Sequence, residues 1–128
     1  MAKRQGMVYV IDDDQSVRNA LLGLFSSVNL TGKGFSSTEE FLSDERRERN
    51  ACILIDLRVL GSTGFDLQKS LTSQGIEIPV IVISASDDLK NREHARELGA
   101  VGFFRKPVDD QALLDAVWWA ITGHSKNG

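Results

Sequence analysis

A chain of 128 residues is long enough for one globular domain, and 41% hydrophobic with 26% charged residues is typical of a folded protein rather than a disordered or fibrous one. The formal net charge of −3 argues against a nucleic-acid-binding surface on this segment, because phosphate neutralisation requires clustered Lys and Arg. The apolar stretches are too short for a signal-peptide core or a membrane span, and the single cysteine cannot form an internal disulfide. We therefore expect a cytoplasmic protein that contacts neither membrane nor nucleic acid directly.

The first part of the chain alternates between strand and helix patterns. An apolar run at 7–11 lacks polar alternation, as strands buried on both faces do. Apolar residues of 17–28 then recur with the spacing of one helix face, and we expect Asp14 or Ser16 to cap this helix. A weaker pattern at 31–35 fits a short strand at the edge of a sheet.

The alternation continues to the last predicted helix. Ser37 and Glu40 have the spacing of a capping box before a short helix. The apolar run at 52–56 predicts another fully buried strand, with Cys52 as a small core residue and Asp56 at its carboxyl end. Further elements are expected over 65–71 (helix), 79–84 (strand), 86–99 (helix), 101–104 (strand) and 109–121 (helix). Five strand–helix repeats predict a parallel sheet covered by helices on both faces.

We expect no role in the chemistry of a site for the two tryptophans or the two histidines. Trp118 and Trp119 are neighbours in the last predicted helix, so only one of them can pack on its apolar face. His94 and His124 lie in polar stretches, and we expect both to be solvated rather than phosphorylated or bound to metal.

Four of the predicted strands end in polar residues of distinct chemistry. Because parallel strands all point one way, these residues are expected to meet at one edge of the sheet, where ligands bind in open α/β folds. Gathered carboxylates repel one another and need a cation, and an all-oxygen set with room for water suits Mg²⁺ or Mn²⁺. The residues are Asp12 and Asp13, Asp56, Ser84 and Lys106.

The chemistry of this edge points to phosphoryl transfer. A lone aspartate after a strand is more often a turn or helix cap, but here acids, a hydroxyl and a lysine all end strands. A metal, the ammonium of Lys106 and the hydroxyl of Ser84 would surround Asp56, and phosphoryl transfer depends largely on such positioning and charge neutralisation. We therefore expect Asp56 to act as a nucleophile and to become an aspartyl phosphate.

These motifs resemble the receiver domain of bacterial two-component response regulators. The matching features are the acidic pair 12–13, Asp56, Gly64, the pair 84–85 and the pair 106–107, and they span nearly the whole chain. The resemblance implies a flavodoxin-like or CheY-like (βα)₅ sheet in the order 2-1-3-4-5. We place the receiver domain at 7–122, between tails at 1–6 and 123–128, the second of which would begin a linker if an output domain follows.

The resemblance implies a metal site. Asp13, Asp56 and the main-chain carbonyl of Arg58 would bind Mg²⁺ or Mn²⁺, with Asp12 assisting through water. The family often has Met-Pro at the third and fourth positions after the phosphorylated aspartate, where this chain has Val59 and Leu60. We expect this loop to be less rigid here.

The resemblance also implies a switch. Ser84, Ala85 and Lys106 would contact the phosphoryl group, and Ser84 and Phe103 would change position when it is present. This change would alter the surface formed by the fourth helix, the fifth strand and the fifth helix. The implied partners are a sensor histidine kinase and, through that surface, an output domain or effector protein that could regulate transcription, or a second copy in a phosphorylation-dependent homodimer.

Two alternatives remain open. A small Mg²⁺-dependent phosphohydrolase of the haloacid-dehalogenase type also forms an aspartyl phosphate, and the DxD spacing of Asp12 and Asp14 suits it. Turnover of free phosphomonoesters that is abolished by Asp12→Asn but not by Asp56→Asn would favour that enzyme. A pseudo-receiver would instead bind a partner without phosphorylation or Mg²⁺. Our first expectation is a phosphoacceptor that phosphorylates and dephosphorylates itself, not a turnover enzyme.

Overall fold

A computed structural model describes residues 6–44, 50–59, 62–86 and 88–122. The predicted tails lie outside these residues, as does His124, except that Gly6 begins the first strand. The elements are β1 (Gly6–Ile11), α1 (Gln15–Ser26), β2 (Leu30–Phe35), α2 (Thr38–Ser43), β3 (Ala51–Asp56), β4 (Arg58–Val59), β5 (Ser62–Thr63), α3 (Gly64–Gln74), β6 (Val80–Ser84), α4 (Leu89–Glu97), β7 (Gly102–Arg105) and α5 (Asp110–Thr122).

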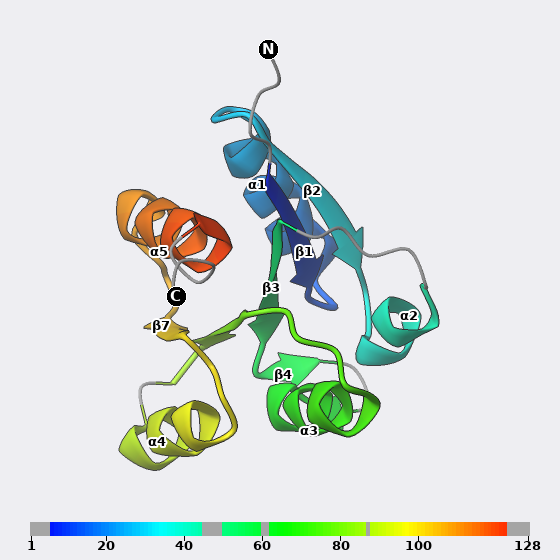
Figure 1. The fold of residues 1–128 in the computed structure, drawn as a ribbon. Coiled ribbons are helices and arrows are strands. Elements are labelled where there is room, and N and C mark those ends of the chain that lie inside the picture. Colours follow the sequence, from blue (N-terminus) through cyan, green and yellow to red (C-terminus); the bar gives the residue numbers. More distant parts are fainter. Residues whose placement is uncertain (1–5, 45–49, 60–61, 87, 123–128) are drawn as a thin grey trace.

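The main sheet has five strands in the order β2-β1-β3-β6-β7, and every neighbouring pair is parallel. Counted along the main sheet alone, this is the order 2-1-3-4-5, so the predicted fold class is confirmed. The weak pattern at 31–35 corresponds to β2, which is an edge strand as expected. Helices α1 and α5 cover one face, whereas α2, α3 and α4 cover the other (Figure 1).

The loop after β3 contains a small hairpin that the sequence did not predict. Strands β4 and β5 pair in antiparallel register, with Arg58 opposite Thr63. Leu60 lies outside the described residues, so the expected loss of rigidity in this loop stays a prediction.

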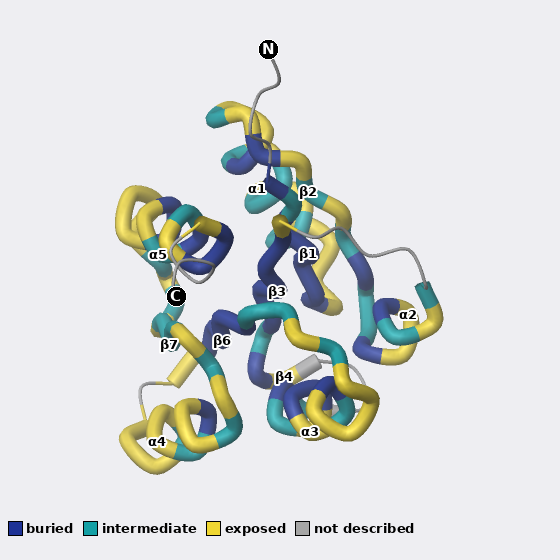
Figure 2. Tube along the Cα trace, in the orientation of Figure 1, coloured by how far each residue is buried: buried dark blue, intermediate teal, exposed yellow. Residues whose placement is uncertain are grey.

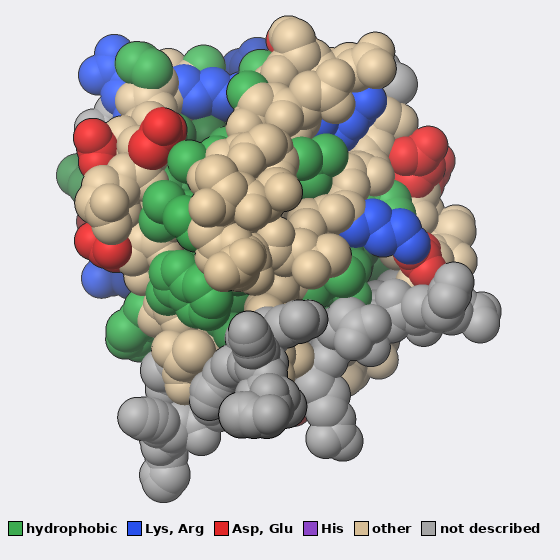
Figure 3. All heavy atoms as spheres, turned by 90° about the horizontal axis from the view of Figure 1, so that it is seen from above, with side chains coloured by type: hydrophobic (Ala, Val, Ile, Leu, Met, Phe, Trp, Pro, Cys, Tyr) green, Lys and Arg blue, Asp and Glu red, His purple; other side chains and the backbone are tan. Residues whose placement is uncertain are grey.

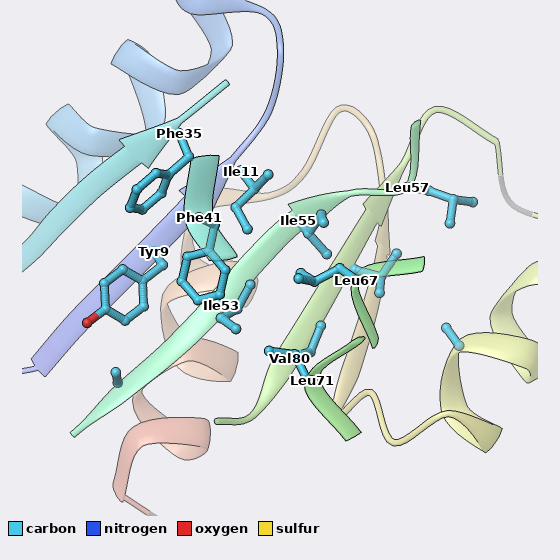
Figure 4. Close-up of a cluster of buried hydrophobic side chains, with 13 residues drawn as sticks. Tyr9, Ile11, Phe35, Phe41, Ile53, Ile55, Leu57, Leu67, Leu71 and Val80 are labelled. Atoms are coloured by element: carbon cyan, nitrogen blue, oxygen red, sulfur yellow. The ribbon is translucent and has the colours of Figure 1, made fainter. Parts of the chain in front are cut away.

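The core on the α2–α4 face is built around three aromatic rings. The ring of Phe41 lies 5.4 Å from both Tyr9 and Phe35, and it meets Phe35 edge to face. Figure 4 shows these rings beside the aliphatic side chains of β3 and α3. Aromatic pairs at this spacing add to the stabilisation that comes from burying their area.

The core on the α1–α5 face is mostly aliphatic and also contains the ring of Phe25. Cys52 belongs to it and is fully buried, which confirms its prediction as a core residue. Trp118 packs against this core, whereas Trp119 is 56% exposed, so only one of the two tryptophans packs, as expected. Figure 2 shows β1, β3 and β6 buried along most of their length between the two helical layers.

Polar side chains begin the first two helices as the sequence predicts. The carboxylate of Asp14 accepts hydrogen bonds at the start of α1, and the hydroxyl of Ser37 accepts from the main-chain N–H of Glu40. The second half of the predicted capping box differs, because the carboxylate of Glu40 accepts from the N–H of Ser36 rather than from that of Ser37. The chain is therefore held one residue before the helix cap.

Within the described ranges, none of the helices has the length and apolar character needed to span a bilayer. On the face drawn in Figure 3, the coloured Lys and Arg side chains are separated by other side chains and by Asp and Glu, so no continuous basic surface forms there among the described residues. The expectation that this segment does not bind nucleic acid stays a prediction.

We expect Phe41→Ala to lower the free energy of unfolding by about 3–5 kcal/mol, because it removes the central ring of the aromatic cluster and leaves a cavity. Urea unfolding followed by circular dichroism measures the change. The control is Trp119→Ala on the exposed side of α5, which should cost less than about 1 kcal/mol. Equal losses in the two variants would contradict this description of the core.

We expect the thiol of Cys52 to resist labelling in the native protein. Burial raises its pKa to about 12, so at about pH 8 it stays protonated, whereas the unfolded thiol is partly ionised and reactive. Reaction with a thiol-specific disulfide reagent should be complete within minutes in urea and negligible without it. Similar rates in both conditions would mean that β3 is not packed as described.

Candidate functional site

The parallel register of the sheet brings the predicted polar residues to one edge. Asp12 follows the last residue of β1, and Asp56 ends β3. Ser84 ends β6, directly opposite Arg105 of β7, and Lys106 comes next. The structure therefore places side by side residues that are far apart in the sequence.

Three carboxylates form an acidic cluster, which consists of Asp12, Asp13 and Asp56. Each offers one oxygen, and these oxygens all lie within 4.8 Å of one another. Their surroundings differ, since Asp12 is buried, Asp56 is partly buried and Asp13 is exposed. Among the described residues Asp13 makes no hydrogen bond or ion pair, so its carboxylate is available to a ligand.

Lys106 supplies the positive charge of the site. Its Nζ lies 3.0 Å from Oδ2 of Asp56 and 3.5 Å from Oδ2 of Asp12. Burial by itself lowers the pKa of Lys106, but the hydrogen bond and charge of Asp56 and the charge of Asp12 outweigh it, so this pKa is raised. The ammonium therefore stays charged and bridges two carboxylates.

The pKa of Asp12 is also raised. Burial of the carboxyl group is the largest cause, and repulsion from Asp56 adds to it. The main-chain N–H of Asp14, 2.9 Å from Oδ1 of Asp12, and the charge of Lys106 oppose this shift without cancelling it. A cation bound to the cluster would stabilise the ionised form of Asp12, which burial and the charge of Asp56 disfavour.

The turn after β3 is fixed by main-chain contacts. The N–H of Arg58 donates to Oδ1 of Asp56 at 3.2 Å, and the N–H of Gly64 donates to the carbonyl of Leu57 at 2.7 Å. A Cβ on Gly64 would lie 3.4 Å from the Cα of Leu57, which is ordinary van der Waals contact, so the hydrogen bond rather than the lack of a side chain ties Gly64 to this turn. The side chain of Arg58 is exposed, and the role of its carbonyl as a metal ligand stays a prediction.

A full capping box next to this turn was missed in the sequence. The hydroxyl of Thr63 accepts from the N–H of Asp66, and the carboxylate of Asp66 accepts from the N–H of Thr63. The signal was present as Thr-x-x-Asp before an amphipathic stretch. The cap fixes the residue at which α3 begins.

Ser84 lies next to the acidic cluster with its hydroxyl proton uncommitted. It is buried, and its Oγ accepts from the N–H of Ser86 at 3.1 Å, which leaves the O–H able to donate. The main-chain N–H of Lys106 donates to the carbonyl of Ser84 at 2.8 Å, so the two strand ends are directly linked. The neighbouring Ala85 is exposed, and its predicted contact with a phosphoryl group stays a prediction.

Phe103 is half-buried and has a partner that the sequence did not reveal. The guanidinium carbon of Arg92 lies 5.0 Å from the centre of its ring, which is a cation–π distance. Both residues line a cavity of about 330 Å³ between α4 and β7, together with Leu89 and Val101. The predicted movement of Phe103 would therefore change the lining of this cavity.

The expectation that His94 is solvated holds in part, since 44% of its side chain is exposed, but its ring also has a partner that the sequence did not reveal. Its ring is half-buried and meets the ring of Phe65 edge to face, 4.4 Å between centres, so it joins α4 to α3. Its Nδ1 also lies 3.9 Å from the carboxylate of Glu97. Helix α4 has few apolar residues, and this contact depends on a neighbouring helix that no local pattern identifies.

At this edge of the sheet, three kinds of functional group lie close together. They are a carboxylate cluster that can bind a hard divalent cation, the ammonium of Lys106 and the hydroxyl of Ser84. Asp56 is the carboxylate that all three features surround. Such an arrangement can receive a group that carries several negatively charged oxygens, because each of those oxygens finds a positive charge or a donor.

Comparison with known proteins agrees with this arrangement. A family model for the response regulator receiver domain matches residues 8–118. The chain is 38% identical to the response regulator protein TodT of Pseudomonas putida over 121 residues, and 37% identical to the transcriptional regulatory protein FixJ of Azorhizobium caulinodans over the same length. These alignments cover 94% of this chain but only 53% and 57% of the two relatives, so the chain spans little more than half of their length.

Solved structures show the same similarity. Full-length FixJ from B. japonicum is 30% identical, with a TM-score of 0.86 over 94% of this chain and 60% of that one. A response regulator receiver protein from Pseudoalteromonas atlantica is 26% identical, with a TM-score of 0.83 over 92% of this chain and 98% of that one. The chain therefore belongs to the response regulator receiver domain family of two-component systems.

Proposed function

We propose that this receiver domain accepts a phosphoryl group on Asp56 from a sensor histidine kinase, in a Mg²⁺-dependent reaction in the cytoplasm. The contact that carries the proposal is that of Lys106 Nζ with Oδ2 of Asp56 at 3.0 Å, within a cluster of three carboxylates. An ammonium at this distance supplies charge to an incoming phosphate and keeps the acceptor carboxylate in place.

In the proposed transfer, a carboxylate oxygen of Asp56 attacks the phosphorus of a phosphohistidine. The new P–O bond forms as the P–N bond breaks, and the leaving imidazole nitrogen keeps the electron pair and takes a proton from solvent. Lys106 and the hydroxyl of Ser84 donate hydrogen bonds to the phosphoryl oxygens. Phosphorylation would replace the contact of Lys106 with the Asp56 carboxylate by a contact of Lys106 with the phosphoryl group.

The acidic cluster fits Mg²⁺ or Mn²⁺, because these ions prefer oxygen ligands and retain water. We propose that Asp13, Asp56 and the main-chain carbonyl of Arg58 bind the ion and that Asp12 assists through water. The exposed carboxylate of Asp13 and the buried one of Asp12 suit these two roles. A bound ion would supply positive charge to the phosphoryl oxygens.

A protein donor could reach Asp56 along an apolar groove beside Lys106. The groove encloses about 440 Å³ between α1 and α5, and its walls include Val17, Leu21, Val108 and Leu113. An apolar groove that reaches Lys106, which contacts the acceptor Asp56, suits one face of an amphipathic helix. We propose that a helix of the kinase, carrying the phosphohistidine, lies in this groove.

We propose that phosphorylation is passed on through Ser84 and Phe103 to the surface of α4, β7 and α5. Leu89 and Val101 are 65% and 40% exposed on that surface, as expected for a place that a partner covers. The occupant would be an output domain or effector protein, or a second copy in a phosphorylation-dependent homodimer. Relatives described as transcriptional regulatory proteins favour an output that controls transcription.

The environment of Asp14 favours a phosphoacceptor over a turnover enzyme. A haloacid-dehalogenase type enzyme would use the second acid of the DxD pair in catalysis, whereas Asp14 accepts from the N–H of Ser16 and Val17 as the cap of α1. We therefore propose that the chain phosphorylates and dephosphorylates itself but does not turn over free phosphomonoesters.

We expect incubation with Mg²⁺ and acetyl phosphate or phosphoramidate to add one phosphoryl group to the intact chain. Intact-mass spectrometry measures the addition, which Asp56→Asn or a chelator should abolish, and peptide mapping after borohydride trapping should place it on Asp56. Addition that survives Asp56→Asn would contradict the proposal, as would the lack of any adduct with either donor and with a panel of phosphorylated kinases.

We expect Mg²⁺ to raise the melting temperature. A ligand at about ten times its Kd adds about 1.4 kcal/mol to the stability, which is roughly 5 °C for a chain of this size. Asp13→Asn should remove most of this shift, measured by calorimetry with and without Mg²⁺. The control is Asp88→Asn at the cap of α4, where Asn caps as well as Asp. Equal shifts in the two variants would contradict the assignment of the metal site.

A further inference from the structure

The residue before Asp13 is anchored by a side chain that the proposed chemistry does not use. The main-chain N–H of Asp12 donates to the carbonyl of Phe35 at 3.1 Å, which ties it to the neighbouring strand. The main-chain carbonyl of Asp12 accepts from Nη1 of Arg18 at 2.7 Å. Among the described residues this arginine is the one side chain that hydrogen bonds to the main chain of the acidic pair.

Strand β2 is shaped to let Arg18 reach that carbonyl. A Cβ on Gly34 would lie 3.2 Å from Cδ of Arg18 and 3.6 Å from its Nε, so the arginine stem lies directly on the main chain of β2. Gly34 is opposite Val10 in the register of β1 with β2, two residues before Asp12. The stem of Arg18 therefore lies against β2, while its guanidinium reaches the carbonyl of the residue that follows β1.

The contact bears on the geometry of the cluster. A charged donor makes a short and strong hydrogen bond to a carbonyl, and this one fixes the peptide that joins Asp12 to Asp13. The side chain of Asp13 has no hydrogen bond of its own in the described structure, so its direction depends on its main chain. Holding that main chain thus aims Asp13 at the other two carboxylates.

We propose that Arg18 is a positioning residue for cation binding, acting through the main chain between Asp12 and Asp13, with Gly34 providing the space that it needs. The inference rests on the proposed metal site. According to this inference, Arg18 strengthens cation binding, whereas its positive charge alone would weaken it. A nearby positive charge repels a divalent cation, so an arginine that acted only through its charge would weaken binding, and its removal would strengthen binding.

The opposite signs make the test direct. In Arg18→Met the stem remains and the charge and donor are lost, whereas in Arg18→Lys the charge remains and the fork of donors is lost. We expect both variants to weaken Mg²⁺ binding by about tenfold or more, the usual effect of removing a group that orients a metal ligand. Isothermal titration with Mg²⁺ alone measures the Kd. The control is Arg96→Met on the exposed part of α4, which removes the same charge and should leave the Kd unchanged.

Gly34→Ala provides a second route to the same effect. The added methyl group would press against the stem of Arg18, so this variant should also weaken Mg²⁺ binding in the wild-type background. Combined with Arg18→Met it should add little, because the side chain that it displaces is already ineffective. Melting temperatures in chelator separate these effects from general unfolding, and each variant should melt within a few degrees of the wild type.

Phosphorylation supplies a further readout. With acetyl phosphate as donor, Arg18→Met should raise the Mg²⁺ concentration for half-maximal rate about tenfold and leave the rate at saturating Mg²⁺ within about twofold of the wild type. Tighter Mg²⁺ binding in Arg18→Met with an unchanged Kd in Arg18→Lys would overturn the inference in favour of a charge effect. Unchanged affinity in both variants would overturn it while the proposed function stands, and absence of Mg²⁺ binding by the wild type would overturn both.

Discussion

The ammonium of Lys106, held between Asp56 and Asp12, is the interaction on which the site depends. Two carboxylates about 4 Å apart repel by roughly 4 kcal/mol at an effective dielectric constant near 20. A parallel sheet concentrates that cost, because it brings the ends of its strands to one edge. The same sheet offsets it by placing a lysine after β7 beside an aspartate 50 residues earlier in the chain. In the proposed transfer, the ammonium that offsets the repulsion between the acids would also be the charge that an incoming phosphoryl group meets.

The two sides of the site are held to different degrees. On the side of α3, the capping box at Thr63 fixes the start of the helix, and the hydrogen bond from the N–H of Gly64 to the carbonyl of Leu57 holds the turn after β3. On the side of α4, the helix is joined to α3 near its carboxyl end, where Gln68 Nε2 donates to the carbonyl of Ala95 at 3.0 Å. Its amino end presents an exposed Leu89 at the rim of a cavity. If Ser84 moves as proposed, the amino end of α4 is less tied to α3 than its carboxyl end and can follow more readily.

The sequence was sufficient to predict the sheet and the residues at its edge, because buried strands and amphipathic helices have distinct periods and parallel strands share a direction. What it missed depends on contacts between elements or on very short elements. Strands β4 and β5 have two residues each and therefore no period. The contacts of Arg18 with Asp12 and of Arg92 with Phe103 join elements whose packing no local pattern describes. The ring contact of His94 was missed for the same reason, since Phe65 lies on another helix.

Asp12 and Asp13 are adjacent in the sequence, yet the fold places them in different surroundings. The first is buried, and its main-chain N–H, its carbonyl and both carboxylate oxygens each face a partner. The second is exposed, and its side chain has no such partner in the described structure. A cation that exchanges with solvent needs at least one accessible carboxylate. A cation site with defined geometry also needs a carboxylate whose position is fixed. Because β1 ends at the residue before this pair, a single turn of chain supplies both, and the anchoring of Asp12 sets where Asp13 can reach.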